Sequence, residues 1–283
     1  MTSIRFSVII PFFNSSGTLS RALDSVAAQT CPPSEIIIAD DASSAAEAAA
    51  LDQCVGRYGQ LNIRVIRLPS NGGPGVARHT ACQVASGSWL AFLDADDAWR
   101  SSKLEVQTRL IERYPGVAIW GGRSGRATTP PVESEATGFT FTSVRKMAFG
   151  NPYATSTVVV ASTCYFGFSP DMRFCEDYDL WCRTVARTGV GGCIEEQLAC
   201  SFKRTFGESG ESAKLWRMEK GELSVLLRLW RGKSLGATTY FLATSYSLPR
   251  FIRRLVITML ATKGLFGSSV LARPARQGDK WFC

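Results

Sequence analysis

Along the chain, short runs of apolar and β-branched residues alternate with segments whose apolar residues recur every three or four positions. Four runs have the composition of buried strands: FSVIIPFF (6–13), EIIIADDAS (35–43), NIRVIRL (62–68) and SWLAFLDADD (88–97). Three segments between them have helical spacing: residues 18–30, 45–58 and 75–86. This alternation predicts an α/β fold, in which a doubly wound, mostly parallel sheet is flanked by helices.

Polar residues follow three of the predicted strands. Asn14 follows the first, Asp40 and Asp41 end the second, and a group of acidic residues ends the fourth. In open α/β sheets, ligands bind beyond the carboxyl ends of the parallel strands. We therefore expect these side chains to converge on one crevice.

The stretch FLDADDAW (92–99) places Asp94, Asp96 and Asp97 directly after an apolar run. Alternation along a strand would direct Asp94 and Asp96 to the same side, provided that the strand continues that far. Two such carboxylates suit a hard cation such as Mg²⁺ or Mn²⁺. Asp97 would complete the metal site, bind a ribose hydroxyl or cap a helix expected over 99–109. The alternative is a helix cap with spare surface acids, but the position beside other polar strand ends favours the metal site.

Composition and charge narrow the class of protein. The chain has 283 residues, of which 45% are hydrophobic and 20% charged, as is typical of a globular protein. A net charge of +8 suggests an anionic partner: nucleic acid, a membrane surface or a phosphorylated substrate. The nine cysteines form no C-x-x-C pair, which favours buried thiols in a reducing compartment. The first residues form a poor signal peptide, since Pro11 interrupts the apolar run.

Four motifs, in their order and spacing, resemble those of family 2 glycosyltransferases of the GT-A fold. They are SVIIPFFN (7–14), IIIADDAS (36–43), NGGPGVARHTA (71–81) and LAFLDADD (90–97). The resemblance covers roughly the first two hundred residues. It implies a catalytic domain over 1–210, with a nucleotide-binding half (1–98) and an acceptor half (99–210), followed by a helical C-terminal extension (211–283).

The resemblance also implies roles for single residues at the donor site. A sugar nucleotide would lie across Pro11, Phe13 and Asp41, with Asp41 contacting the base. The family's DxD aspartates correspond to Asp94 and Asp96, which would bind the ribose and the cation that bridges the donor diphosphate. Arg78 stands where the family has an arginine near the donor. Asp97, next to the DxD aspartates, would complete the cation site.

A second acidic motif, FCEDYDLWCR (174–183), contains the candidate catalytic base. Acids in the first turn of a helix are favoured by the helix dipole alone, and that role is compatible with catalysis. The family's E-D-x-D-L-W motif matches here, and its second position is Asp177, which would accept the proton of the acceptor hydroxyl. A histidine that the family often has after the base is missing, so Lys203 and Arg204 are expected to supply positive charge to the diphosphate.

The glycine loop NGGPG (71–75) has two interpretations of similar weight. Its backbone amides would approach a phosphate, or the loop is a tight turn between strand and helix. The single histidine, His79, follows this loop without a nearby acid–base partner, and we interpret it as structural.

The last seventy residues lie outside the resemblance and mix apolar with basic side chains. No apolar run is long enough to span a bilayer. Arg250, Arg253 and Arg254, beside several large apolar residues, predict an amphipathic helix on an anionic membrane surface. The alternative is a pair of helices packed on the catalytic domain with a basic face towards solvent. No nucleic-acid partner is expected, because no binding motif accompanies the charge.

The sequence thus predicts a metal-dependent, inverting hexosyltransferase that uses a nucleotide sugar, by default a UDP-hexose. Its acceptor would be a lipid-linked oligosaccharide of a bacterial surface or exported polysaccharide. The expected location is cytoplasmic, on the inner face of the cell membrane. The alternative function is a non-catalytic scaffold that kept the fold and binds a sugar nucleotide or a membrane. The presence of Asp177 favours the enzyme.

Overall fold

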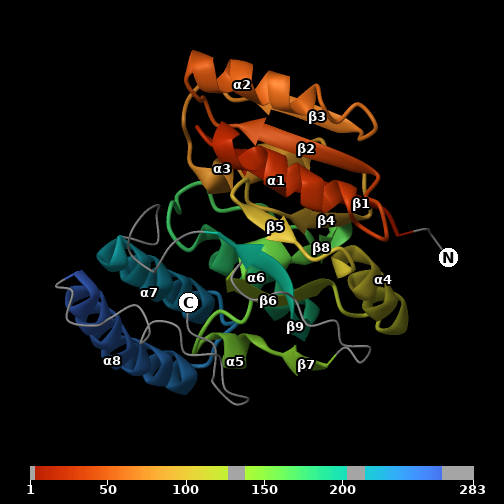
Figure 1. The fold of residues 1–283 in the computed structure, drawn as a ribbon. Coiled ribbons are helices and arrows are strands. Elements are labelled where there is room, and N and C mark those ends of the chain that lie inside the picture. Colours follow the sequence, from red (N-terminus) through yellow and green to blue (C-terminus); the bar gives the residue numbers. More distant parts are fainter. Residues whose placement is uncertain (1–3, 127–137, 203–213, 263–283) are drawn as a thin grey trace.

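One nine-stranded sheet forms the centre of the molecule in the computed structural model, which describes residues 4–126, 138–202 and 214–262 (Figure 1). Its strand order is β3-β2-β1-β4-β8-β6-β9-β5, with β7 paired to β9. The first four strands are β1 (Phe6–Phe12), β2 (Glu35–Asp40), β3 (Ile63–Arg67) and β4 (Trp89–Phe92). All pairings among these four are parallel, so the predicted α/β class is confirmed.

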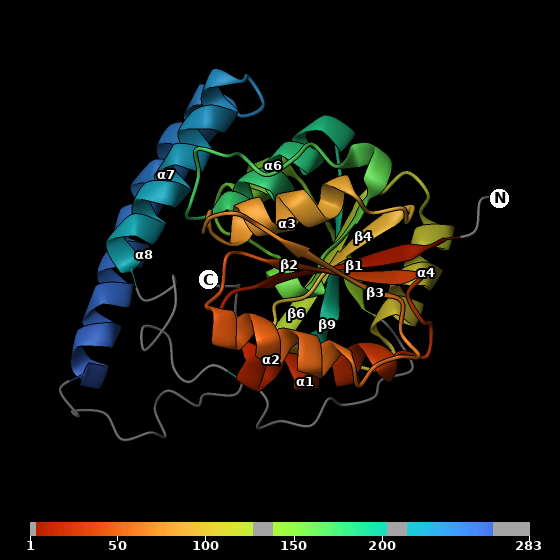
Figure 2. The same cartoon turned by 90° about the horizontal axis from the view of Figure 1, so that it is seen from above.

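Helices cover both faces of this parallel part of the sheet. They are α1 (Ser16–Ala27), α2 (Ala45–Val55) and α3 (Pro74–Gln83). Alternate residues of β1 face opposite layers: Val8 belongs to the core cluster beneath α1 and α2, and Ile9 to the cluster beneath α3 and α6. Figure 2 shows α1 and α2 on one side of the sheet and α3 and α6 on the other. Burial of both faces explains why these strands are continuous apolar runs.

The second half extends the same sheet with strands that pair mainly antiparallel. These are β5 (Asp97–Trp99), β6 (Ile119–Arg126), β7 (Phe139–Thr142), β8 (Val159–Ala161) and β9 (Gly191–Ser201). Between them lie α4 (Lys103–Arg113), α5 (Val144–Met147), α6 (Glu176–Thr188) and two 3₁₀ turns, η1 (Thr155–Thr157) and η2 (Ser162–Cys164). Strand β8 pairs antiparallel with both β4 and β6 and so joins the two halves.

The predicted fourth strand was too long. Strand β4 ends at Phe92, and the chain turns before β5 begins at Asp97. Asp94 and Asp96 therefore lie in the turn, where alternation along a strand does not apply. The helix expected over 99–109 is α4, Lys103–Arg113. Asp97 consequently lies in a strand and does not cap a helix.

Two further helices, α7 (Leu215–Arg231) and α8 (Ala237–Thr262), pack against each other along one side of the molecule (Figures 1 and 2). Within the described residues, no helix is both long and apolar enough to cross a bilayer.

The prediction that Arg250 faces a membrane is wrong. Its side chain is buried and pairs with Glu222 of α7, and its guanidinium donates to the carbonyl oxygen of Phe149 at 2.9 Å. Arg254 is half-buried, 3.7 Å from the same carboxylate of Glu222. Only Arg253 of the three is exposed. For Arg250, helix packing is therefore the correct interpretation, because a buried carboxylate on the neighbouring helix requires a positive partner.

We expect Arg250→Ala to lower the free energy of unfolding by about 3 to 5 kcal/mol, because it leaves the Glu222 carboxylate buried without its main partner. Arg253→Ala removes the same charge from an exposed position of α8 and should change stability by about 0.5 kcal/mol or less. Urea unfolding followed by circular dichroism measures both. Equal effects of the two substitutions would contradict the packing role of Arg250.

Candidate active site

A cleft of about 740 Å³ opens at the carboxyl ends of β1, β2 and β4 and extends to the start of α6. Every predicted site residue in the described part of the chain except Asp97 lines it: Pro11, Phe13, Asp41, Arg78, Asp94, Asp96 and Asp177. Lys203 and Arg204 lie outside the described residues. The crevice expected from the polar strand ends is therefore present, although Asn14 does not line it and instead accepts a hydrogen bond from the backbone of Ser44 at 3.0 Å.

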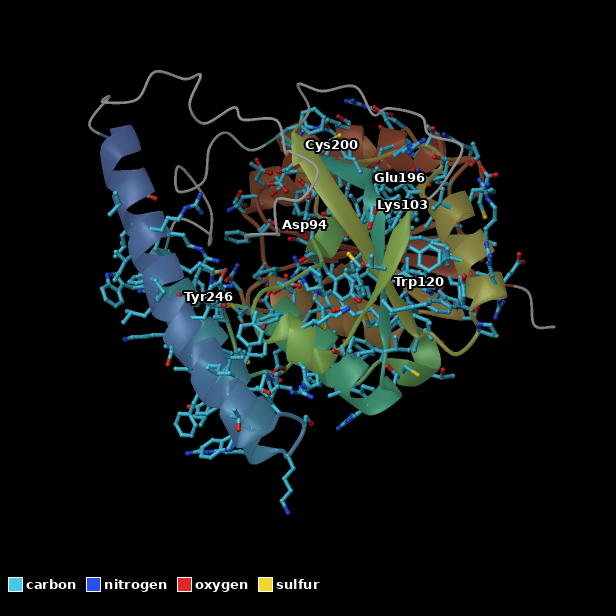
Figure 3. The ribbon with its side chains drawn as sticks, turned by 90° about the horizontal axis from the view of Figure 1, so that it is seen from below. Asp94, Lys103, Trp120, Glu196, Cys200 and Tyr246 are labelled. Atoms are coloured by element: carbon cyan, nitrogen blue, oxygen red, sulfur yellow. The ribbon has the colours of Figure 1, made fainter. Side chains whose placement is uncertain are left out.

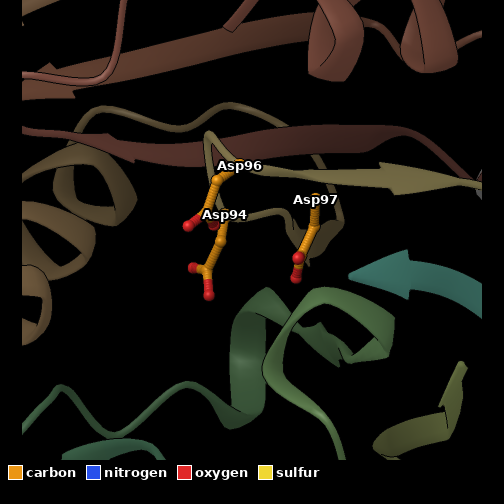
Figure 4. A group of neighbouring side chains, drawn as sticks. All are labelled: Asp94, Asp96 and Asp97. Carbon is orange, nitrogen blue, oxygen red and sulfur yellow. The ribbon is translucent and has the colours of Figure 1, made fainter. Parts of the chain in front are cut away.

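Three carboxylates form a compact cluster at the turn between β4 and β5. Ligand oxygens of Asp94, Asp96 and Asp97 all lie within 4.8 Å of one another. Figure 4 shows the three side chains extending from the turn and from β5 towards the same side. Asp94 and Asp96 are half-buried and reach the cleft, while Asp97 is buried. Hard oxygen ligands at this spacing fit a divalent cation such as Mg²⁺ or Mn²⁺.

Asp97 is the innermost of the three carboxylates. It accepts a hydrogen bond from the hydroxyl of Ser156 at 2.5 Å. Burial, followed by the nearby charge of Asp94, raises the pKa of Asp97 to about 7, although the Ser156 bond opposes the shift. Without a cation, the cluster therefore does not hold three full negative charges at neutral pH.

Arg78 links the acidic cluster to the second half of the site. Its buried guanidinium donates to Asp94 at 2.7 Å and to Glu176 of α6 at 3.0 Å. Burial by itself lowers the pKa of the guanidinium, but the charges of Asp94 and Glu176 outweigh it and raise the pKa. Arg78 is therefore a permanent cation, and its position within the protein is set by two carboxylates from different elements.

A close approach of α3 and α6 makes this bridge possible. A Cβ atom on Gly75 would lie 2.7 Å from Cγ of Glu176, so a larger residue would displace the side chain of Glu176. Gly75 therefore lets Glu176 pack beside the first turn of α3, one turn before Arg78.

Asp177 follows Glu176 in the first turn of α6 and lines the cleft. One carboxylate oxygen accepts from the hydroxyl of Thr155 at 2.5 Å, and the other from the backbone amide of Tyr178 at 2.7 Å. Both oxygens are thus oriented by donors, and the half-buried side chain can still accept a proton from a group in the cleft.

The turn η1 connects the two acidic centres. Thr155 bonds to Asp177, and its neighbour Ser156 bonds to Asp97 and accepts from the backbone amide of Asp94 at 3.2 Å. The indole of Trp99 donates to the carbonyl of Ser156 and so fixes the turn from β5. One short turn therefore carries donors for both the acidic cluster and Asp177.

The glycine loop serves as a turn whose amides are already occupied. Gly72 and Gly73 donate to the two carboxylate oxygens of Asp41 at 2.8 and 2.7 Å. Gly73 has φ +89°, a left-handed conformation that favours glycine. Burial raises the pKa of Asp41, while these amide bonds oppose the rise. Of the two interpretations left open, the structural turn agrees with these contacts, since the two amides do not face a phosphate.

Several residues that line the cleft were missed by sequence reasoning. Thr155, Arg173, Lys214 and Met218 all line it. Arg173 donates to the side chain of Asn71 at 3.2 Å and lies just before the α6 motif, which was the available signal. His79 bonds to the hydroxyl of Tyr165 at 2.8 Å, in agreement with a structural role.

Comparison with known sequences gives a family and several relatives. Residues 7–172 match the family described as Glycosyl transferase family 2. Over 116 residues the chain is 35% identical to the amylovoran biosynthesis glycosyltransferase AmsB of Erwinia amylovora, covering 41% of this chain and 38% of that protein. Over 118 residues it is 39% identical to the putative teichuronic acid biosynthesis glycosyltransferase TuaG of Bacillus subtilis, covering 41% and 45%. These matches span less than half the length of either relative.

A longer match reaches an enzyme of Escherichia coli. The UDP-Glc:alpha-D-GlcNAc-diphosphoundecaprenol beta-1,3-glucosyltransferase WfgD is 27% identical over 217 residues, or 76% of this chain and 82% of that protein.

Solved structures share the fold. The TarS fragment 1–349 of S. aureus in complex with UDP-GlcNAc superposes with a TM-score of 0.67 at 18% identity, covering 87% of this chain and 72% of that one. The mannosyltransferase PcManGT of Pyrobaculum calidifontis, in complex with GDP-Man and Mn²⁺, gives 0.64 at 18% identity, covering 94% and 77%.

The family match covers more than half of the chain and includes β1, the glycine loop and the acidic cluster. With the fold and the arrangement of the cleft, it leads to one conclusion: this chain belongs to glycosyl transferase family 2.

Proposed function

We propose that the enzyme transfers a hexose from a UDP-sugar to a lipid-linked saccharide during the synthesis of a bacterial polysaccharide. One observation carries the proposal: Asp94, Asp96 and Asp177 line a single cleft. Arg78 joins Asp94 to Glu176, the neighbour of Asp177, and the turn η1 bonds to both Asp177 and Asp97. The relatives AmsB, TuaG and WfgD support a role in polysaccharide synthesis. The name of WfgD also supports a UDP-hexose donor and a lipid-diphosphate acceptor.

In this proposal Asp177 is the general base of a single displacement. The acceptor hydroxyl loses its proton to the carboxylate of Asp177 as its oxygen bonds to the anomeric carbon, and the bond to the diphosphate breaks. Thr155 and the amide of Tyr178 hold the carboxylate in place, so a free lone pair faces the acceptor. Attack from the side opposite the leaving group inverts the anomeric centre.

At the other end of the cleft, Asp94, Asp96 and Asp97 would hold Mg²⁺ or Mn²⁺. A bound cation there supplies Lewis-acid stabilisation of the diphosphate leaving group. Arg78 orients Asp94 towards this position and offsets its charge. Pro11, Phe13 and Asp41 would accommodate the nucleotide at the ends of the first two strands.

Lys203 and Arg204 are proposed to neutralise the diphosphate. The position of the residues just before them supports this proposal. Ser201 of β9 pairs with Asp97 of β5, so β9 ends beside the acidic cluster. The next residue, Phe202, packs beneath the guanidinium of Arg21, which also donates to the carbonyl of Asp96 at 2.9 Å. The chain thus enters the segment 203–213 beside the acidic cluster.

We further propose that the enzyme works on the inner face of the cell membrane, bound through the outer face of α8 and not through Arg250. The large apolar side chains exposed on α8 are Phe241, Leu242, Tyr246, Leu248, Ile252 and Val256. Arg231 at the end of α7, Lys233 in the turn between the two helices and Arg253 on α8 are also exposed. An apolar face bordered by basic side chains is typical of helices that lie on anionic lipid surfaces.

The scaffold alternative makes a different prediction, namely binding without turnover. The decisive experiment incubates UDP-, GDP- and dTDP-sugars with p-nitrophenyl and alkyl-diphosphate glycosides of hexoses and N-acetylhexosamines, and detects products by mass spectrometry. With Mn²⁺ or Mg²⁺ we expect transfer from a UDP-hexose. Excess chelator, or Asp96→Ala, should abolish transfer and weaken binding of the UDP-sugar at least tenfold, as measured by calorimetry.

Glu112→Ala, which removes an exposed carboxylate from α4, provides the matched control and should leave both measurements unchanged. Full activity in excess chelator would show that the acidic cluster does not require a metal. The absence of any product from the wild-type protein would contradict the transferase proposal.

We expect Asp177→Asn to lower turnover by about two to four orders of magnitude, because the amide keeps the size of the side chain but cannot accept the proton. Affinity for the UDP-sugar should change little, since the base faces the acceptor. Steady-state rates and calorimetry measure the two effects, and NMR of the wild-type product gives its anomeric configuration. Retention of the donor's configuration would rule out single displacement.

We expect Leu248→Glu combined with Ile252→Glu to weaken binding to vesicles of anionic lipid at least tenfold. Even partial burial of two such side chains contributes about 1.5 kcal/mol or more, and 1.4 kcal/mol corresponds to a factor of ten. Vesicle flotation measures the partition coefficient.

The matched control combines Ala49→Glu with Gln53→Glu on the exposed side of α2, at the end of the molecule far from α8 (Figure 1). It adds the same charge at the same spacing and should reduce binding only slightly. Equal losses in the two double variants would point to net charge alone, and would refute the specific role of α8.

A further inference from the structure

A second hollow, of about 260 Å³, adjoins the cleft on the side of α7 and α8. Four residues line both spaces: Thr155, Cys175, Asp177 and Met218. Asp94, Asp96 and Arg78 line the cleft but not this hollow. Asp177 therefore stands at the boundary between the two spaces.

The C-terminal helices supply part of the wall of the hollow, and residues from 151–155 and 175–178 supply the rest. Leu215 and Met218 of α7 form one side, and Arg250 and Arg254 of α8 lie along it. Figure 3 shows α8 running beside the body of the molecule on the side where Asp94 lies. Both helices lie beyond residues 7–172, which match the family. The part of the wall that α7 and α8 supply therefore lies outside the residues that match the family.

The lining combines apolar surface with charged side chains. Tyr153, Leu215 and Met218 supply apolar surface, while Glu222 paired with Arg250 supplies charged hydrogen-bonding atoms. A sugar ring has apolar C–H faces and a rim of hydroxyls, so it matches a pocket of this kind. The volume is suited to a single sugar ring.

The direction of attack in a single displacement indicates which substrate the hollow would bind. In a single displacement the attacking hydroxyl approaches opposite the leaving diphosphate, and it must contact the base. The diphosphate belongs with the acidic cluster in the cleft, so the acceptor reaches Asp177 from the other side, which is where the hollow opens.

We propose that the hollow binds the terminal sugar of the acceptor, and that α7 and α8 thereby determine which acceptor is used. This rests on the proposed function. The same two helices would then link the membrane, the acceptor and the base, since the outer face of α8 is apolar and α7 borders Asp177.

The test places a larger side chain in the hollow, at a position that does not line the cleft. Leu215→Trp is made in the full chain, with Leu215→Phe as a smaller increment. The readout is a ratio of two rates: the rate of transfer to the best glycoside of the acceptor panel, divided by the rate at which water hydrolyses the UDP-sugar. We expect Leu215→Trp to lower this ratio at least tenfold through a raised KM for the acceptor, and Leu215→Phe to lower it less.

Lys220→Trp, exposed on the same helix and outside both spaces, is the matched control and should leave both rates unchanged. Hydrolysis reports on folding and on the donor site in every variant. An unchanged ratio in both Leu215 variants overturns the inference, and so does a parallel loss of hydrolysis and transfer. A wild-type protein that neither binds nor hydrolyses a UDP-sugar contradicts the proposed function instead.

Discussion

The site depends on one buried cation. Arg78 lies between Asp94 of the acidic cluster and Glu176 of α6, and these carboxylates come from opposite halves of the chain. Removing one partner of a buried pair typically costs about 3 to 5 kcal/mol. The arrangement thus uses ion pairing to hold the acidic cluster and the start of α6 together, and Gly75 leaves room for the side chain of Glu176.

Sequence pattern was sufficient for the parallel half of the sheet. Its strands are buried on both faces, so they are apolar runs with clear ends. Of the polar residues at those ends, Asp41, Asp94 and Asp96 line the cleft as expected, while Asn14 and Asp40 do not. The antiparallel half was not predicted, because β5 and β8 have three residues each and β6 contains three glycines. Such segments are stabilised by their neighbours in the sheet and have little local pattern of their own.

At the site, residue identity was easier to predict than geometry. Asp94 and Asp96 share the cleft, but a turn places them there and not the alternation of a strand. The charge pattern of α8 was equally compatible with lipid contact and with packing. The ion pair with Glu222, which is distant in the sequence, shows that Arg250 packs against α7. No local sequence rule identifies such a partner. Thr155 was missed for the same reason, since its role depends on a contact with a residue 22 positions away.

The turn η1 has a mechanical consequence. Thr155 and Ser156 are adjacent, so their Cα atoms are about 3.8 Å apart whatever the rest of the molecule does. One hydroxyl bonds to Asp177 and the other to Asp97. A displacement of the turn would therefore move the partners of both carboxylates together. The turn thus couples the positions of Asp177 and the acidic cluster through a single peptide unit.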